Sequence, residues 1–196
     1  MSDKGRHRNA WAEWSLSRLA VKRAAGGIIA NGSRARPADA MMQIGKREGG
    51  APFLQVNDPE AVAPVISISH AQASAVGAAA QAGWQMGIDY DLPARIRDPE
   101  GFMDQILSPA ERQTLGLGTS REAAVLAWTV KEASAKALGL GLQGRPQEFV
   151  LTLYDAAQGL AQIRHGGALV QAQVRQIDAA ICTVAYARNL GPGGNL

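Results

Sequence analysis

One predicted helix carries the residues best suited to chemistry in this chain. Trp128, Glu132 and Lys136 are spaced four residues apart, so they lie on one face of the helix expected over residues 120–138. Lys131 lies beside this stripe. A stripe that combines an aromatic ring, a carboxylate and two ammonium groups differs from the apolar stripe of an ordinary amphipathic helix. Such a stripe can hold an anion and a metal ion together, but a solvated Glu–Lys face explains this helix equally well.

Two carboxylates at the end of a predicted strand favour a metal ion. Residues 83–91 alternate between apolar side chains and small or polar ones, which is typical of a half-buried strand. Asp89 and Asp91 fall on the same face of that strand, and Gly87 leaves space beside them. Neighbouring carboxylates repel each other unless a cation neutralises them, and Mg²⁺ is commonly bound by one or two carboxylates. A polar strand end, where aspartate is common, is the alternative.

A third segment ends in a hydroxyl and an imidazole. Residues 65–70 alternate as a strand does and end in Ser69 and His70, whose side chains can donate hydrogen bonds to a phosphate. The sequence has no Gly-x-Ser-x-Gly motif and contains three histidines, which argues against a serine hydrolase. Residues 139–144 fit Gly-x-Gly-x-x-Gly, but they close a helix instead of opening one. We therefore interpret them as a helix stop and a close-packed loop, not as a dinucleotide site.

Taken in order, three motifs of this chain resemble those of the 4'-phosphopantetheinyl transferases. They are Ser-Ile-Ser-His, Gly-Ile-Asp-Tyr-Asp and Trp-Thr-Val-Lys-Glu-Ala-Ser-Ala-Lys-Ala-Leu-Gly-Leu-Gly-Leu, and the resemblance covers residues 65–150. The chain is most similar to the larger, surfactin-synthetase type, which has two similar halves in one chain, because a whole half-domain precedes the Gly-Ile-Asp strand. The resemblance implies two similar α/β halves related by a pseudo-twofold axis, with helices packed on antiparallel sheets.

The resemblance also implies an activity. Enzymes of this family move the 4'-phosphopantetheine group of coenzyme A to a serine of an apo acyl or peptidyl carrier protein and release adenosine 3',5'-bisphosphate. By resemblance, Asp89, Asp91 and Glu132 would bind Mg²⁺, or Mn²⁺ in its place, against the pyrophosphate of coenzyme A. Many relatives have glutamate at the position of Asp91. Lys131 and Lys136 would add positive charge near the bridging and leaving oxygens.

Further contacts are implied by the same resemblance. Ser69 and His70 match the pair that binds the 3'-phosphate of coenzyme A. Basic residues of the N-terminal region would contact the coenzyme phosphates, namely Arg18, Lys22, Lys46 and Arg47. Glu111 matches a candidate general base that accepts the proton of the carrier serine. Because Ser108 and Glu111 also form a helix-start signal, a structural role explains Glu111 equally well.

The order of the predicted elements favours an α+β fold. A basic helix at residues 10–25, a strand meander, two helical stretches (the second capped by Thr119) and four short strands follow one another. After the first helix, the ranges are 65–91, 99–117, 120–138, 148–154, 160–164, 168–176 and 179–187. We expect an N-terminal half at residues 1–82, a C-terminal half at residues 83–190 and a disordered tail at residues 191–196. The carboxylates would then line a cleft between the halves.

Charge is distributed unevenly along the 196 residues. Residues 1–47 carry ten Lys or Arg and three Asp or Glu, whereas the remainder carries ten and fourteen, which gives the overall +3. A basic first segment suits an anionic ligand such as coenzyme A, an acidic carrier protein or nucleic acid. Because aromatic residues are not interleaved with the basic ones, we expect no nucleic-acid partner. A nucleic-acid-binding module and an inactive scaffold that binds coenzyme A or a carrier protein stay as alternatives.

We expect a cytoplasmic protein that is monomeric and has no membrane partner. The single cysteine, Cys182, cannot form an internal disulfide, and no segment resembles a signal peptide or is long and apolar enough to span a membrane. The carrier protein is expected to dock on the segment before the Trp128 helix, where apolar residues are flanked by arginines. Those residues are Met103, Ile106, Leu107, Leu115 and Leu117, with Arg95, Arg97, Arg112 and Arg121.

Overall fold

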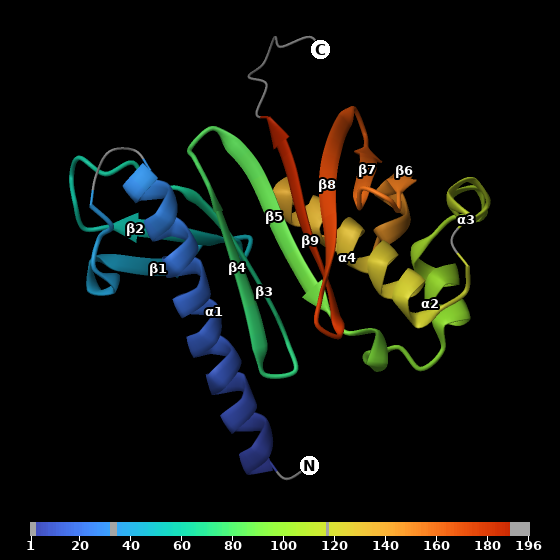
Figure 1. Ribbon diagram of the computed structural model, residues 1–196, viewed down its shortest axis with the longest axis horizontal. Coiled ribbons are helices and arrows are strands. Elements are labelled where there is room, and N and C mark those ends of the chain that lie inside the picture. The colour runs from blue at the N-terminus through green and yellow to red at the C-terminus, as the bar shows by residue number, and fades with distance from the viewer. Residues whose placement is uncertain (1–2, 32–34, 117, 189–196) are drawn as a thin grey trace.

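The computed structural model describes residues 3–31, 35–116 and 118–188 of the chain. Its sheets are antiparallel: a five-stranded sheet carries a helix on one face, and a long N-terminal helix packs on a separate hairpin (Figure 1). This arrangement confirms the predicted α+β class. The predicted disordered tail, residues 191–196, lies outside the described residues. None of the described helices combines the length and the hydropathy needed to cross a membrane.

One long helix and two hairpins form the N-terminal part of the fold. These elements are α1 (Asp3–Asn31), β1 (Met42–Lys46), β2 (Pro52–Val56), β3 (Val65–Ala71) and β4 (Ser74–Ala80). Helix α1 extends beyond both ends of its predicted range and packs on the β3–β4 hairpin. Gly77 allows this close approach, because a Cβ at that position would clash with the backbone of Val21.

The C-terminal part is built on the five-stranded sheet. In spatial order its strands are β5 (Trp84–Asp91), β9 (Ala180–Arg188), β8 (Ala168–Ile177), β7 (Leu160–His165) and β6 (Val150–Asp155). Each of these strands begins and ends within two residues of its predicted range. Strands β6 to β9 follow one another as a meander, and β5 pairs with β9 at one edge of the sheet.

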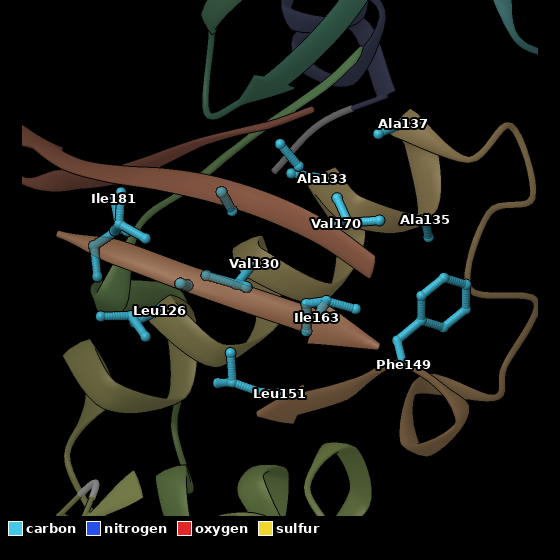
Figure 2. Packing of buried hydrophobic residues seen from close by; sticks show 14 of the residues in the cluster. Leu126, Val130, Ala133, Ala135, Ala137, Phe149, Leu151, Ile163, Val170 and Ile181 are labelled. Carbon is cyan, nitrogen blue, oxygen red and sulfur yellow. The ribbon is translucent and has the colours of Figure 1, made fainter. Parts of the chain in front are cut away.

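Helix α4 (Arg121–Ala137) covers one face of this sheet and forms the main hydrophobic core with it (Figure 2). Val130 of the helix and Ile163 of β7 are fully buried in this core. Gly87 of β5 lies directly under the helix, where a Cβ would clash with the carbonyl oxygen of Ala133. The glycine therefore lets the helix approach the strand. This corrects the expectation that it leaves open space beside the carboxylates.

Both ends of α4 differ in detail from the prediction. Ser120, not Thr119, caps the helix, because the Ser120 hydroxyl accepts a hydrogen bond from the Ala123 amide at 3.1 Å. At the other end, three glycines of residues 139–144 have positive φ angles of 71°, 63° and 75°, which confirms a helix stop. A Cβ on any of these glycines would meet no atom within 4 Å. The prediction that this loop is close-packed is therefore wrong.

Short helices connect the main elements. They are α2 (Pro99–Ile106) and α3 (Pro109–Leu115), with 3₁₀ turns η1 (Asp39–Met41), η2 (Pro93–Arg95) and η3 (Pro146–Glu148). The predicted helical stretch 99–117 is broken in the middle, because Ser108 precedes a proline and adopts an extended backbone with ψ 157°.

Side-chain hydroxyls join the N-terminal part to the C-terminal sheet. Strand β3 lies beside β5, but the two strands do not share a backbone ladder. Instead, the Ser67 hydroxyl accepts a hydrogen bond from the Ile88 amide at 3.0 Å, and the Ser69 hydroxyl accepts one from the Tyr90 amide at 3.3 Å. Since buried backbone amides need acceptors, these serine hydroxyls supply them for two amides on the edge of β5 that faces β3. We call this contact the β3–β5 seam.

Candidate active site

A cleft of about 500 Å³ opens at the end of the β3–β5 seam, against helix α4. Residues of three predicted motifs line it together, namely Ser69, His70, Asp89, Asp91, Trp128, Glu132 and Lys136. A second groove of about 670 Å³ lies between the β1–β2 hairpin, the β3–β5 seam and the glycine loop after α4. Glu132 and Lys136 line both spaces, so they stand where the cleft and the groove meet.

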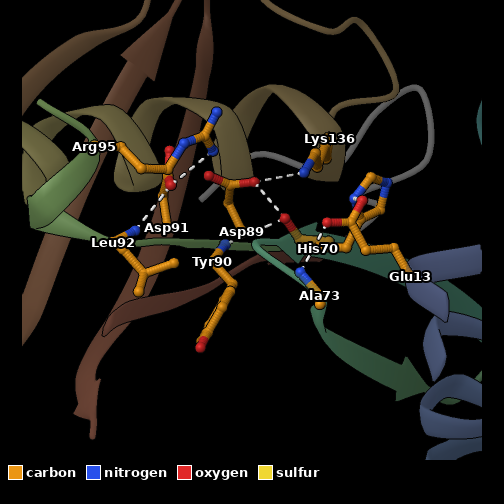
Figure 3. Close-up of polar contacts among 10 residues, drawn as sticks. Glu13, His70, Ala73, Asp89, Tyr90, Asp91, Leu92, Arg95 and Lys136 are labelled. Carbon is orange, nitrogen blue, oxygen red and sulfur yellow. Dashed lines mark hydrogen bonds and ion pairs between the residues drawn. The ribbon is translucent and has the colours of Figure 1, made fainter. Parts of the chain in front are cut away.

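Asp89 and Lys136 form the central ion pair of the cleft. Lys136 Nζ lies 2.6 Å from Asp89 Oδ1 (Figure 3). It also donates a hydrogen bond to the Ile88 carbonyl oxygen at 3.1 Å. The Asp89 side chain is 9% exposed and that of Lys136 is 30% exposed. The ammonium group therefore retains access to a ligand in the cleft, while the carboxylate is almost enclosed.

Glu132 brings a second carboxylate to the same place. Its side chain is half-buried, and among the described residues it has no hydrogen-bond or ion-pair partner. Burial raises the pKa of Glu132, the ammonium of Lys136 lowers it, and the nearby carboxylate of Asp89 raises it. A carboxylate that is desolvated beside another carboxylate is stabilised by a cation. Asp89 and Glu132 thus fit a divalent cation with oxygen ligands.

Asp91, the third predicted metal ligand, faces a different partner. Its Oδ1 accepts hydrogen bonds from the Leu92 amide at 2.8 Å and from Arg95 Nη1 at 2.9 Å (Figure 3). Within residues 3–31, 35–116 and 118–188, no three His, Cys, Asp or Glu side chains are arranged to hold a metal ion. Asp91 is therefore paired with Arg95 and is not grouped with Asp89 and Glu132.

The Ser69–His70 pair points in two directions. The Ser69 hydroxyl is buried and donates a hydrogen bond to Asp89 Oδ1 at 2.8 Å, so it is already used inside the protein. His70 lines the cleft and is more exposed, and its Nδ1 lies 3.1 Å from Glu13 Oε2 of α1. Glu13 was not among the predicted site residues. Its sequence position gives no signal, because the contact depends on how α1 packs on the hairpin.

Lys131 and Glu111 lie in the interior instead of the cleft. Lys131 Nζ is 2.8 Å from Glu111 Oε1, and their side chains are 0% and 2% exposed. Glu111 also accepts hydrogen bonds from the Ser108 amide at 2.7 Å and the Leu151 amide at 2.8 Å. Burial lowers the pKa of Lys131, while the hydrogen bond and the charge of Glu111 raise it.

This interior placement has a simple geometrical cause. Lys131 is one residue from Glu132, and one residue turns a helix by about 100°, which carries the side chain to another face. The predicted capping signal of α3 is confirmed, because the Ser108 hydroxyl and the Glu111 carboxylate bind each other's backbone amides. The structure therefore assigns this pair to the joining of α3, α4 and β6, and it does not bring either residue to the cleft.

The predicted basic contacts are mostly outside the cleft. The Arg18 guanidinium lies 3.7 Å from the centre of the Trp14 ring, and Lys22 donates a hydrogen bond to the Asp39 carbonyl oxygen at 2.7 Å. Neither of these basic residues lines the described part of the cleft or the groove, and Lys46 does not either. Arg47, by contrast, lines the groove.

The apolar residues expected to receive a carrier protein are largely part of the core. Met103, Ile106 and Leu107 are at most 2% exposed, because the apolar side of α2 packs against α4. Leu117 and the side chain of Leu115 lie outside the described residues. The prediction that Met103, Ile106 and Leu107 contact a carrier protein is therefore wrong, because these side chains are buried.

An apolar wall of the cleft was partly missed by the sequence reasoning. Phe102 and Trp128 make an edge-to-face contact with ring centres 5.6 Å apart, and Ile96 lies beside them in the lining. The helical spacing singled out Trp128 but not Phe102, which comes from α2. The cleft thus presents charged groups on one side and an aromatic wall on the other.

Two comparisons add context without deciding the family. The holo-[acyl-carrier-protein] synthase of Neisseria meningitidis superposes on 54% of this chain and on 98% of its own chain, with 18% sequence identity and a TM-score of 0.45. No curated protein sequence matches the chain.

A family comparison covers the part of the chain that carries the cleft carboxylates and the lysine. The model of the 4'-phosphopantetheinyl transferase superfamily matches residues 85–185, from β5 to β9. The matched segment contains Asp89, Glu132 and Lys136 and amounts to 101 of the 196 residues, since 185 − 85 + 1 = 101. The N-terminal part of the fold lies outside it. Because the match extends over more than half of the sequence, the chain belongs to the 4'-phosphopantetheinyl transferase superfamily.

Proposed function

We propose that this protein transfers the 4'-phosphopantetheine group of coenzyme A to a serine of an apo acyl or peptidyl carrier protein and requires Mg²⁺ for it. The observation that carries the proposal is the meeting of Asp89, Glu132 and Lys136 in one cleft. The first residue comes from a strand and the other two from a helix that begins 30 residues after that strand ends, since 121 − 91 = 30. Family membership supports the same class of reaction.

Phosphoryl transfer depends on the positioning of the reactants and on the neutralisation of phosphate charge, and it needs no covalent intermediate with the enzyme. The serine oxygen forms a bond to the phosphorus that carries the pantetheine arm, and the bond from that phosphorus to adenosine 3',5'-bisphosphate breaks. The electron pair of the broken bond stays on the oxygen of the bisphosphate, and the serine proton passes to water. Held by Asp89 and Glu132, Mg²⁺ would neutralise charge on the phosphate oxygens. The ammonium group of Lys136, at the junction of the cleft and the groove, is placed to stabilise the developing charge on the leaving oxygen.

The two adjoining spaces suit an extended anionic substrate. We propose that the nucleotide end of coenzyme A lies in the groove, where Arg47 supplies positive charge, and that its phosphates reach the junction lined by Glu132 and Lys136. His70 is the imidazole in the cleft and is proposed to donate a hydrogen bond to one of the phosphates. The aromatic wall of Phe102 and Trp128 would contact the apolar part of the arm or of the carrier protein.

Several finer features belong to the same proposal. We propose the larger type of transferase, with two halves at residues 1–82 and 83–190, because α1 and two hairpins precede the segment that the family model matches. A cytoplasmic monomer without nucleic-acid or membrane partners is proposed with it. Glu111 is proposed to be structural, because three donors already enclose its carboxylate.

Mass spectrometry of apo carrier proteins tests the proposal. Carriers of fatty acid, polyketide and peptide pathways are incubated with coenzyme A, the protein and either Mg²⁺ or EDTA. At least one carrier should gain the mass of phosphopantetheine in Mg²⁺ and none in EDTA. If no carrier is modified although the protein binds coenzyme A, the protein is a binding scaffold; salt-sensitive oligonucleotide binding without transfer would favour the nucleic-acid alternative.

A further inference from the structure

A carboxylate of the N-terminal helix contacts a histidine that lines the cleft. Glu13 Oε1 accepts a hydrogen bond from the Ala73 amide at 2.9 Å, and Glu13 Oε2 lies 3.1 Å from His70 Nδ1 (Figure 3). The Glu13 side chain is 20% exposed, whereas that of His70 is 54% exposed. The carboxylate is thus held between the helix and the hairpin, and the imidazole stays open towards the cleft that it lines.

The hairpin tip beside Glu13 has an unusual backbone. Gln72 and Ala73, the two residues between β3 and β4, have φ angles of 47° and 63°. Two-residue turns with positive φ at both positions normally use asparagine, aspartate or glycine, which tolerate this conformation better. The hydrogen bond from the Ala73 amide to Glu13 supports the turn and so fixes the place of His70, which lies three residues before Ala73.

We infer that Glu13 is a positioning residue for His70, an assignment that rests on the proposed binding of coenzyme A. Glu13 holds Nδ1 of the imidazole towards α1, which leaves Nε2 to donate a hydrogen bond to a phosphate group of the coenzyme. Donation from both ring nitrogens requires the imidazolium form, in which each nitrogen carries a hydrogen. The partner of one imidazole nitrogen sets which nitrogen faces a ligand, so the contact of Nδ1 with Glu13 directs Nε2 to the phosphate.

The negative charge of Glu13 does not oppose a phosphate in this arrangement. Both of its oxygens already face donors, the Ala73 amide and the His70 ring. Arg18, five residues further along the helix, stacks on Trp14 and does not line the described part of the cleft. Glu13 therefore acts through His70, and its removal should matter only while His70 is present.

Calorimetric measurement of the dissociation constant for coenzyme A, with Mg²⁺ present, tests this inference without relying on transfer. Glu13→Ala should raise the dissociation constant about 3- to 10-fold, which is the range for the net contribution of one typical hydrogen bond. Glu13→Gln, which keeps an acceptor for the Ala73 amide but removes the carboxylate from the imidazole, should raise it as well. Glu100→Gln, at an exposed position of α2, is the matched control and should change nothing.

Dephospho-coenzyme A identifies the phosphate that is involved. If both Glu13 variants weaken the binding of coenzyme A alone, His70 faces the 3'-phosphate; if they weaken both ligands equally, it faces the pyrophosphate. Either result supports the positioning assignment. In a His70→Ala background, Glu13→Ala should have no further effect.

Three outcomes would overturn the inference. The first is that His70→Ala weakens binding while both Glu13 variants bind normally, which would leave Glu13 as a clamp of the hairpin. The second is an effect of Glu13→Ala that persists in the His70→Ala background. The third is normal binding by His70→Ala itself. A protein that shows the expected binding pattern but modifies no carrier would contradict the proposed function and leave this inference intact.

Discussion

Ser69 of β3 donates a hydrogen bond to Asp89 of β5, and the two side-chain oxygens lie 2.8 Å apart. The same hydroxyl accepts the amide hydrogen of Tyr90. A residue of the N-terminal hairpin therefore fixes the carboxylate of a strand in the C-terminal sheet. The geometry of the cleft depends on the β3–β5 seam and not on either part alone.

Removal of the Ser69 hydroxyl should affect both the fold and the response to metal. Ser69→Ala leaves the Tyr90 amide without its acceptor and removes one of the two side-chain partners of Asp89, so the free energy of unfolding should fall by about 1–2 kcal/mol. The Mg²⁺ concentration needed for half-maximal transfer should rise. Urea unfolding and a Mg²⁺ titration measure the two effects, with Ser74→Ala on the exposed start of β4 as the control. An unchanged Mg²⁺ response would show that Ser69 does not position Asp89.

The buried pair of Lys131 and Glu111 should be a stability element. Lys131→Met leaves an unpaired carboxylate in the interior, so the free energy of unfolding should fall by about 3–5 kcal/mol. The double variant Lys131→Met, Glu111→Gln should recover much of that loss, because no buried charge remains unpaired. Urea unfolding measures both. A single variant with normal stability but weak binding of coenzyme A would restore Lys131 to the binding site.

Burial of Glu132 should make the stability depend on pH. Burial raises its pKa above the ordinary value of 4.5, with Lys136 opposing the shift and Asp89 adding to it. Above that ordinary value the folded state retains a proton that the unfolded state has lost, so the free energy of unfolding falls as the pH rises through the higher, folded pKa. Glu132→Gln removes this loss and should therefore be more stable than the wild type at about pH 7 but not at about pH 3.

Urea unfolding at a series of pH values, in the absence of Mg²⁺, measures the difference between Glu132→Gln and the wild type. Glu48→Gln, at an exposed position in the β1–β2 turn, serves as the control for the loss of one carboxylate. A difference that does not change with pH would mean that Glu132 is not desolvated in the folded protein.

The contact of α4 with β5 leaves no room for a side chain at Gly87. Gly87→Ala places a methyl group against the Ala133 carbonyl oxygen, and overpacking of this kind costs about 1–3 kcal/mol. Thermal unfolding should show a lowered midpoint, whereas Gly118→Ala, whose Cβ meets no atom within 4 Å, should leave it nearly unchanged. Equal midpoints for the two variants would contradict the close approach of helix and strand.

Local patterns in the sequence predict a large part of this fold. Strand β5 follows from its alternation, which reports the buried side of a single strand. Helix α4 and strands β6 to β9 follow from the capping and turn residues that mark their ends. The meeting of Asp89 with Lys136 is predicted only through the family resemblance. Neither the strand nor the helix indicates by itself that the two lie 2.6 Å apart.

The contacts that the sequence does not predict are those that depend on packing between distant elements. Helical periodicity explains why Lys131 turns away from Glu132, but its pairing with Glu111 depends on how α3 packs against α4, which no periodicity reveals. Glu13 meets His70 only because α1 crosses the hairpin at Gly77. The alternation of the strand places Asp89 and Asp91 on the same face and does not show that their partners differ. In the structure Arg95 binds Asp91, whereas Lys136 binds Asp89.

The most direct test of the account is the rate of carrier modification by Asp89→Asn as a function of Mg²⁺ concentration. The substitution keeps the shape of the side chain but removes the charge that Lys136 and a metal ion would share. We predict a transfer rate reduced by about 100-fold or more at every Mg²⁺ concentration, with a native unfolding transition. A rate near that of the wild type at limiting Mg²⁺ would contradict the assignment of this cleft as the active site.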